Sequence, residues 1–183
     1  ITWLSTYFHV TRDLPIEKAG SMASAVMVLA IVGAPVGGII TDRWRKSNIR
    51  ARLLFPTITT ALSAILLMFA LWMTQGTIQY VFFLLMGVMV TAFLPAAAAV
   101  TQDVIHPGMR AMSYAVAVVV QNLLGASTAP LVIGRLYDLF DIKKAMALLP
   151  FMLIIGAVLF FIGSRFYVKD LEKTAKVKLE PEE

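Results

Sequence analysis

Hydrophobic residues fill five long stretches of the chain that contain no charged residue. These stretches cover residues 19–41, 53–73, 78–101, 111–134 and 145–164. A helix needs about 20 apolar residues to cross a hydrocarbon core about 30 Å thick, and each stretch reaches that length. Because lipid offers the backbone no hydrogen-bond partner, only helices or closed barrels can span it. The pattern therefore predicts five membrane-spanning segments.

A barrel and a soluble helical core both explain this pattern less well. Barrel strands alternate apolar and polar residues over about 10 residues, whereas these stretches are apolar all round and about twice as long. Hydrophobic residues make up 59% of the chain, compared with about 45–50% in an average soluble domain. We therefore predict an all-α membrane protein.

The segments are expected to form one transmembrane bundle over residues 1–167, followed by a cytoplasmic tail over 168–183. The predicted helices cover residues 1–10, 19–41, 52–73, 78–102, 110–134 and 145–167. The first has only about ten residues before Arg12 and is too short to span. We interpret it as the end of a longer helix, so the chain is expected to be part of a larger protein.

The basic residues are distributed unequally between the two sides of the predicted bundle. If the segments alternate in direction, the side with residues 42–52, Arg110 and residues 165–183 receives 11 of the 16 Lys and Arg residues. The positive-inside rule then predicts a cytoplasmic C-terminus in an integral protein of the cell (inner) membrane. Since a basic run between two spans is typical of a topology anchor, we expect no nucleic-acid partner.

A weak internal repeat relates two helix ends on opposite sides of the membrane. Ala34-Pro35 precedes Gly38 and Asp42, and Ala129-Pro130 precedes Gly134 and Asp138, so both ends contain Gly-x-x-x-Asp. Asp42 and Asp138 are predicted on opposite faces. This arrangement favours an inverted three-plus-three helix repeat.

The strongest motif is the sequence Gly38-Ile-Ile-Thr-Asp42-Arg43-Trp-Arg45-Lys46 between the second and third predicted helices. It resembles the signature loop of the major facilitator superfamily, Gly-x-x-x-Asp-Arg-x-Gly-Arg-Arg, although Arg45 replaces a glycine. The resemblance implies the C-terminal six-helix half of a transporter, with its first helix truncated. It also implies a gating motif of Gly38, Asp42, Arg43 and Lys46, which would hold this half against a missing N-terminal half. A role limited to capping and anchoring the helix end is the alternative.

A weaker resemblance concerns the substrate. Residues 101–111, 121–125 and 129–134 are similar to the tenth and eleventh helices of such transporters, and more narrowly to the spinster-like branch and neighbouring organic anion transporters. The spinster-like resemblance implies an amphipathic lipid as the substrate. The organic anion transporters imply a small carboxylate or a sugar acid.

Polar residues within the spans are the candidates for substrate binding. Gln121 and Asn122 lie near the middle of 110–134, where the resemblance implies a cavity, and a helical spacing puts Gln121 and Thr128 on one face. Thr91 and Tyr7 are further candidates. A buried amide in lipid needs a partner, which can be a substrate or a neighbouring helix. No charged residue lies mid-span, so no coupling residue is predicted in this chain.

These observations favour a secondary active transporter that works by alternating access on a small organic solute or an amphipathic lipid. A non-transporting membrane scaffold or receptor of the same fold is the alternative. The expected partners are the substrate, membrane lipids and the missing helical half. We expect no enzymatic activity, cofactor or metal site, because the sequence contains no nucleophile triad, phosphate-binding glycine loop or zinc-ligand spacing.

Overall fold

The computed structural model describes residues 3–73 and 76–177, and every regular element in these ranges is a helix. The prediction of an all-α protein is therefore confirmed. In chain order the elements are α1 (Leu4–Arg12), α2 (Ile16–Arg45), α3 (Ala51–Met68), η1 (Phe69–Met73), α4 (Gly76–Ala92), α5 (Leu94–Asp103), η2 (Pro107–Met109), α6 (Arg110–Val120), η3 (Gln121–Ser127), α7 (Thr128–Leu139), α8 (Ile142–Ala147) and α9 (Leu149–Val177).

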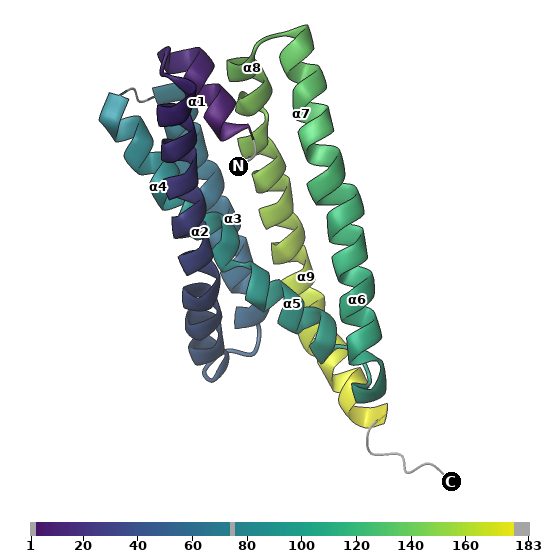
Figure 1. Ribbon diagram of the computed structural model, residues 1–183. Coiled ribbons are helices and arrows are strands. Elements are labelled where there is room, and N and C mark those ends of the chain that lie inside the picture. Colours follow the sequence, from purple (N-terminus) through teal and green to yellow (C-terminus); the bar gives the residue numbers. More distant parts are fainter. Residues whose placement is uncertain (1–2, 74–75, 178–183) are drawn as a thin grey trace.

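Five stretches of helix are long and apolar enough to cross a membrane, as predicted. They are Ile16–Arg45, Ala51–Trp72, Gly76–Asp103, Pro107–Leu139 and Ile142–Thr174. The chain runs back and forth along the bundle, so the turns at 46–50 and 104–106 and the end of α9 lie at one end (Figure 1). We call this the basic end. The end of α2, near Asp42, and the end of α7, near Asp138, lie at opposite ends, as the internal repeat predicts (Figure 1).

Several helices are interrupted within the predicted spans. The span Gly76–Asp103 breaks at Phe93, two residues before Pro95, because a proline cannot donate the backbone hydrogen bond that a continuous helix requires. Two π-helical segments, η1 and η3, continue the helices α3 and α6. In contrast, α2 continues through Pro35 and α3 through Pro56.

The C-terminal boundary differs from the prediction. Helix α9 extends to Val177, ten residues beyond the predicted end at 167. Residues 178–183, the remainder of the predicted tail, lie outside the described residues, as do residues 74 and 75 of the predicted turn between the third and fourth helices.

Glycines allow α2 and α4 to pack closely against each other. A Cβ atom at Gly33 would collide with the carbonyl oxygen of Val88, and one at Gly37 would collide with that of Ala92. Gly87, on α4, faces Val26 at 2.8 Å from the position of such a Cβ. Small residues spaced four apart are typical of close helix packing in membranes, where it is driven largely by van der Waals contact.

The buried core lies towards the end opposite the basic end, where α1 packs on α2 and α4. Phe8 is fully buried, and its ring meets that of Phe83 edge-on at 5.3 Å between centroids. The stretch from Pro107 to Leu139 is different, because almost none of it is buried, and Leu124 is 73% exposed. An apolar surface of this extent is suited to lipid or to further protein rather than to water.

Candidate functional site

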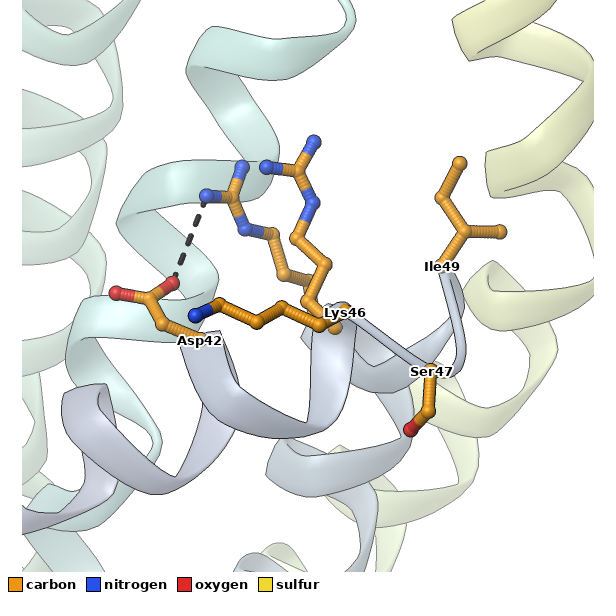
Figure 2. Close-up of a pocket in the computed structure, with 6 residues that line it drawn as sticks. Asp42, Lys46, Ser47 and Ile49 are labelled. Carbon is orange, nitrogen blue, oxygen red and sulfur yellow. Dashed lines mark ion pairs between the residues drawn. The ribbon is translucent and has the colours of Figure 1, made fainter.

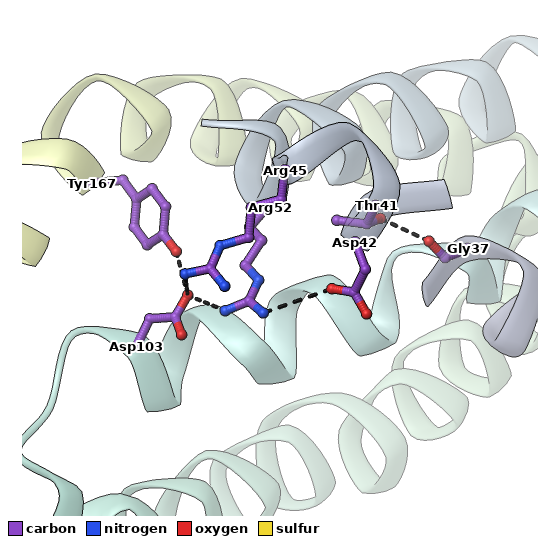
Figure 3. Close-up of polar contacts among 7 residues, drawn as sticks. All are labelled: Gly37, Thr41, Asp42, Arg45, Arg52, Asp103 and Tyr167. Atoms are coloured by element: carbon purple, nitrogen blue, oxygen red, sulfur yellow. Dashed lines mark hydrogen bonds and ion pairs between the residues drawn. The ribbon is translucent and has the colours of Figure 1, made fainter. Parts of the chain in front are cut away.

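Asp103, the last residue of α5, joins four helices at the basic end. Its Oδ2 atom accepts a hydrogen bond from Nη1 of Arg52 and another from the hydroxyl of Tyr167 at 2.5 Å. It also lies 3.4 Å from Nη2 of Arg45. These residues belong to α5, α3, α9 and α2, and their side chains converge on the carboxylate in Figure 3. We call Asp42, Arg45, Arg52, Asp103 and Tyr167 the basic-end cluster.

A short turn brings the two arginines together. Helix α2 ends at Arg45 and α3 begins at Ala51, so only five residues separate them. The carbonyl of Trp44 accepts backbone hydrogen bonds from Ser47 at 3.1 Å and Asn48 at 2.9 Å, which closes the turn. As a result, Arg45 and Arg52 both reach the end of α5.

Asp42 completes the cluster from the surface. Its Oδ1 atom lies 3.6 Å from Nη2 of Arg52, and its side chain is 70% exposed. The side chains of Arg52 and Asp103 are only 13% and 17% exposed. A paired charge that is mostly buried costs several kcal/mol when its partner is removed, whereas an exposed pair contributes about 0–1 kcal/mol. Asp103 is therefore the structural centre of the cluster, and Asp42 is its exposed edge.

The turn also borders an open pocket with a volume of about 730 Å³, which we call the loop pocket (Figure 2). It is lined by Asp42, Arg45, Lys46, Ser47, Ile49 and Arg52. Three of these residues are cationic and one is anionic, so the lining carries a formal excess of two positive charges. The lysine side chain extends across the pocket towards Asp42 in Figure 2.

The structure separates the four residues of the predicted gating motif. Asp42 and Lys46 line the loop pocket, but Gly38 and Arg43 do not. A Cβ atom at Gly38 would lie 3.4 Å from Pro95, a looser contact than those at Gly33 and Gly37. Arg43 is exposed on the last turn of α2. Asp42 forms its ion pair with Arg52, on the first turn of α3, and not with its neighbour Arg43.

Gln121 lies in a groove of about 370 Å³ between α5 and α6. The lining is otherwise aromatic, aliphatic or hydroxylic, and includes Phe93, Ala97, Thr101 and Tyr114. Asn122 is exposed and donates from Nδ2 to the carbonyl of Val118 at 2.8 Å. Of these two predicted substrate residues, Gln121 lines this groove and Asn122 does not.

The π-helical segment η3 separates Gln121 from Thr128. Its i→i+5 bonds widen the helical turn, so residues four and seven apart no longer align as they do in an α-helix. Thr128 instead lines a second groove with Trp3, Arg135 and Asp138 near the opposite end. The sequence predicted that Gln121 and Thr128 lie on the same face of the helix. That prediction assumed an uninterrupted α-helix, and the assumption is wrong.

Thr91 lies in the contact between α4 and α2. Its Oγ1 atom donates to the carbonyl of Ala30 at 2.5 Å, directly beside Gly33. Such a bond between helices satisfies the hydroxyl without a ligand. The structure thus gives Thr91 a packing contact.

Tyr7 belongs to a buried polar network on α1 and α4. The amide of Gln79 donates from Nε2 to the Tyr7 hydroxyl at 2.9 Å and to the carbonyl of Ala70 in η1 at 2.6 Å. Arg12 donates from Nη2 to Oε1 of Gln79 at 2.6 Å and to the carbonyl of Gly76 at 2.5 Å. Tyr7 is only 3% exposed, so a substrate would reach it only if this network opened.

The sequence patterns did not reveal the importance of Arg52, Asp103 or Tyr167. One sequence feature did point to a contact between them. Arg52 and Asp103 each flank an uncharged apolar stretch, at ends that are predicted to lie on the same side of the membrane. Their separation of 51 positions hides the contact, because only packing of the helices brings these residues together. Tyr167 had no distinguishing sequence context.

A comparison of the sequence with known protein families gives a match. A family model described as Major Facilitator Superfamily matches residues 1–130, more than two thirds of the chain. The matched range contains the loop pocket and every residue of the basic-end cluster except Tyr167. No curated protein matches the chain.

Proposed function

The chain belongs to the major facilitator superfamily, a family of membrane transporters, and from this premise we propose that it is a secondary active transporter that works by alternating access. Members of this family are transporters rather than enzymes. The five membrane-length helical stretches are those of an integral membrane protein. The proposed cargo is a small organic solute or an amphipathic lipid.

The proposed gate is the basic-end cluster. The observation that supports it most strongly is the sharing of one Asp103 carboxylate by side chains of three other helices. A movement that separates α2, α3 or α9 from α5 at this end would stretch at least one of these contacts. Since Asp42 is exposed and weakly paired, it is the residue able to exchange partners during such a movement.

Arg43 is proposed to act outside this chain. Its exposed side chain at the end of α2 is available to a second helical unit, which is the proposed partner of the gate. The exposed apolar stretch Pro107–Leu139 would supply part of the contact with that unit or with membrane lipids. Asp42 and Arg43 would then act together in the state that is closed at the basic end.

The basic end is proposed to face the cytoplasm of a cell with an inner membrane, in agreement with the concentration of Lys and Arg there. The chain has no cysteine, so a single introduced cysteine gives a specific label. Ser47→Cys at the basic end and Lys143→Cys at the opposite end form a matched pair of exposed positions. In intact cells an impermeant maleimide should label only the second, and labelling of only the first would reverse the orientation.

The proposed substrate contacts begin with Gln121, which is exposed in the groove between α5 and α6. Asn122 and Thr128 are proposed to contact substrate only after a change in the π-helical segment, because each now bonds a backbone carbonyl of its own helix. Thr91 and Tyr7 would require opening of the α2–α4 contact and of the Gln79 network.

The substrate class is tested by flux into proteoliposomes that contain the full-length protein. A lysophospholipid represents the amphipathic lipids that the spinster-like resemblance favours, and a sugar acid and a small carboxylate represent the organic anions. If one of these classes is taken up or exchanged, and if a Gln121→Leu variant reduces that flux, the proposal is supported. Saturable binding without flux would instead favour the alternative, a receptor or scaffold of the same fold.

A further inference from the structure

The loop pocket contains more positive charge than its own carboxylate compensates. Arg52 is engaged by Asp103 and Asp42, and Arg45 lies near Asp103. Lys46 is exposed and forms no ion pair with any described residue. Even when Asp103 is counted with the lining, three cations face two carboxylates, and the ammonium group of Lys46 is the unpaired one.

The position of the pocket limits which anions can reach it. It lies in the turn between the spans Ile16–Arg45 and Ala51–Trp72, so it is at the level where lipid headgroups meet water. Its lining also includes one aliphatic side chain, that of Ile49. A polar pocket with one apolar wall at this depth is suited to a headgroup as well as to a dissolved anion.

We propose that the loop pocket binds a phosphate group, which is held by Lys46 and Arg45 and comes from either an anionic lipid headgroup or a soluble phosphate. Arginine and lysine side chains both bind phosphate oxygens through charge-assisted hydrogen bonds, arginine often with two. The volume of about 730 Å³ accommodates a phosphate with its substituent and water. This site is additional to the substrate site and does not depend on transport.

A phosphate here would act directly on the basic-end cluster. The Arg45 guanidinium lies 3.4 Å from Asp103, and its side chain is 35% exposed, so it can turn towards an anion in the pocket. Asp42 lines the same pocket and would be repelled by the ligand. Phosphate binding would therefore weaken the contact of α2 with α5 while leaving the buried pair of Arg52 and Asp103 in place.

The test measures lipid retained by the full chain in nanodiscs of phosphatidylcholine with phosphatidylglycerol at about 150 mM salt, where distant charges are screened. Lys46→Gln is the main variant because it breaks no ion pair seen in the structure. Arg50→Gln is the matched control. It also removes one exposed charge from the same turn, but Arg50 does not line the pocket. We expect Lys46→Gln to lower phosphatidylglycerol affinity about fivefold and Arg50→Gln less than about twofold.

A second arm identifies the source of the phosphate. The same proteins in pure phosphatidylcholine nanodiscs are titrated with inorganic phosphate. Binding of inorganic phosphate that requires Lys46 indicates a soluble ligand. Retention of phosphatidylglycerol that requires Lys46 in the first arm, without binding of inorganic phosphate in the second, indicates a headgroup. Equal losses of phosphatidylglycerol affinity in Lys46→Gln and Arg50→Gln would show that the anion is attracted by the overall charge of the turn and not by the pocket. This result would overturn the proposal. Absence of binding in both arms would also overturn it.

Discussion

Arg52 on the first turn of α3 donates a hydrogen bond to Asp103 at the end of α5, and both side chains are more than four-fifths buried. This contact joins two membrane spans at the basic end. The hydroxyl of Tyr167 and the guanidinium of Arg45 share the same carboxylate oxygen (Figure 3). The properties of the cluster therefore depend on Asp103 more than on the exposed Asp42.

The first prediction compares the two carboxylates. Asp103→Asn leaves the buried Arg52 charge without its main partner, so it should lower the free energy of unfolding by about 2 kcal/mol or more. Asp42→Asn removes an exposed pair and should change it by less than about 1 kcal/mol. Unfolding in mixed micelles followed by tryptophan fluorescence measures both. Equal effects would mean that Asp103 is not the centre of the cluster.

The second prediction concerns Asp42 in transport. Asp42→Asn should slow turnover in proteoliposomes several-fold while membrane insertion and yield remain normal, because its exposed ion pair contributes little to stability and the proposed role of Asp42 is in gating. Asp138→Asn is the matched control, since this exposed aspartate lies on the related helix end at the opposite face. Unchanged turnover in Asp42→Asn would remove the gating role.

The third prediction concerns the glycines of α2. Gly37→Ala places a methyl group against the backbone carbonyl of Ala92, so the helices must separate, and the expected loss is about 1–3 kcal/mol. Gly20→Ala is the control on the same helix, because nothing lies within 4 Å of its Cβ position. It should be neutral or slightly stabilising, since alanine favours helix. Thermal unfolding of both variants in one detergent decides this, and equal melting temperatures would contradict the close approach.

The fourth prediction concerns the buried network around Gln79. Gln79→Leu removes the partner of the Tyr7 hydroxyl and of the Arg12 guanidinium, which should cost about 1–3 kcal/mol. Tyr7→Phe alone should cost less. A double-mutant cycle should give a coupling of about 0.5 kcal/mol or more between positions 7 and 79, because they are in direct contact. Additive losses would show that the bond contributes little.

The sequence was sufficient to predict the helical spans, because a lipid environment requires long uncharged stretches and these are visible directly. The same physics explains why the helix ends were less certain. Polar residues can extend a helix beyond the hydrocarbon core, as in α2, which begins at Ile16 and ends at Arg45. The break at Phe93 was not predicted, and proline positions alone would not have located it, because Pro35 and Pro56 caused no break in their helices.

The candidate site was less predictable, because it depends on contacts between distant positions. The motif at 38–46 lies at the turn that borders the loop pocket, and Asp42 and Lys46 line that pocket. The partners Asp103 and Tyr167 come from helices whose packing no local pattern specifies. The π-helical segment at 121–127 likewise has no sequence periodicity of its own, which is why the alignment of Gln121 with Thr128 was wrong.

The central claim is that access to the groove beside Gln121 alternates between the two faces and that the basic-end cluster controls it. Ala117→Cys, in the groove lining, gives a single reactive thiol in a chain without cysteine. An impermeant maleimide applied to oriented vesicles should label it from either face, and Asp103→Asn should increase labelling from the basic end and decrease it from the other. Labelling from one face only, unchanged by Asp103→Asn, would contradict the account.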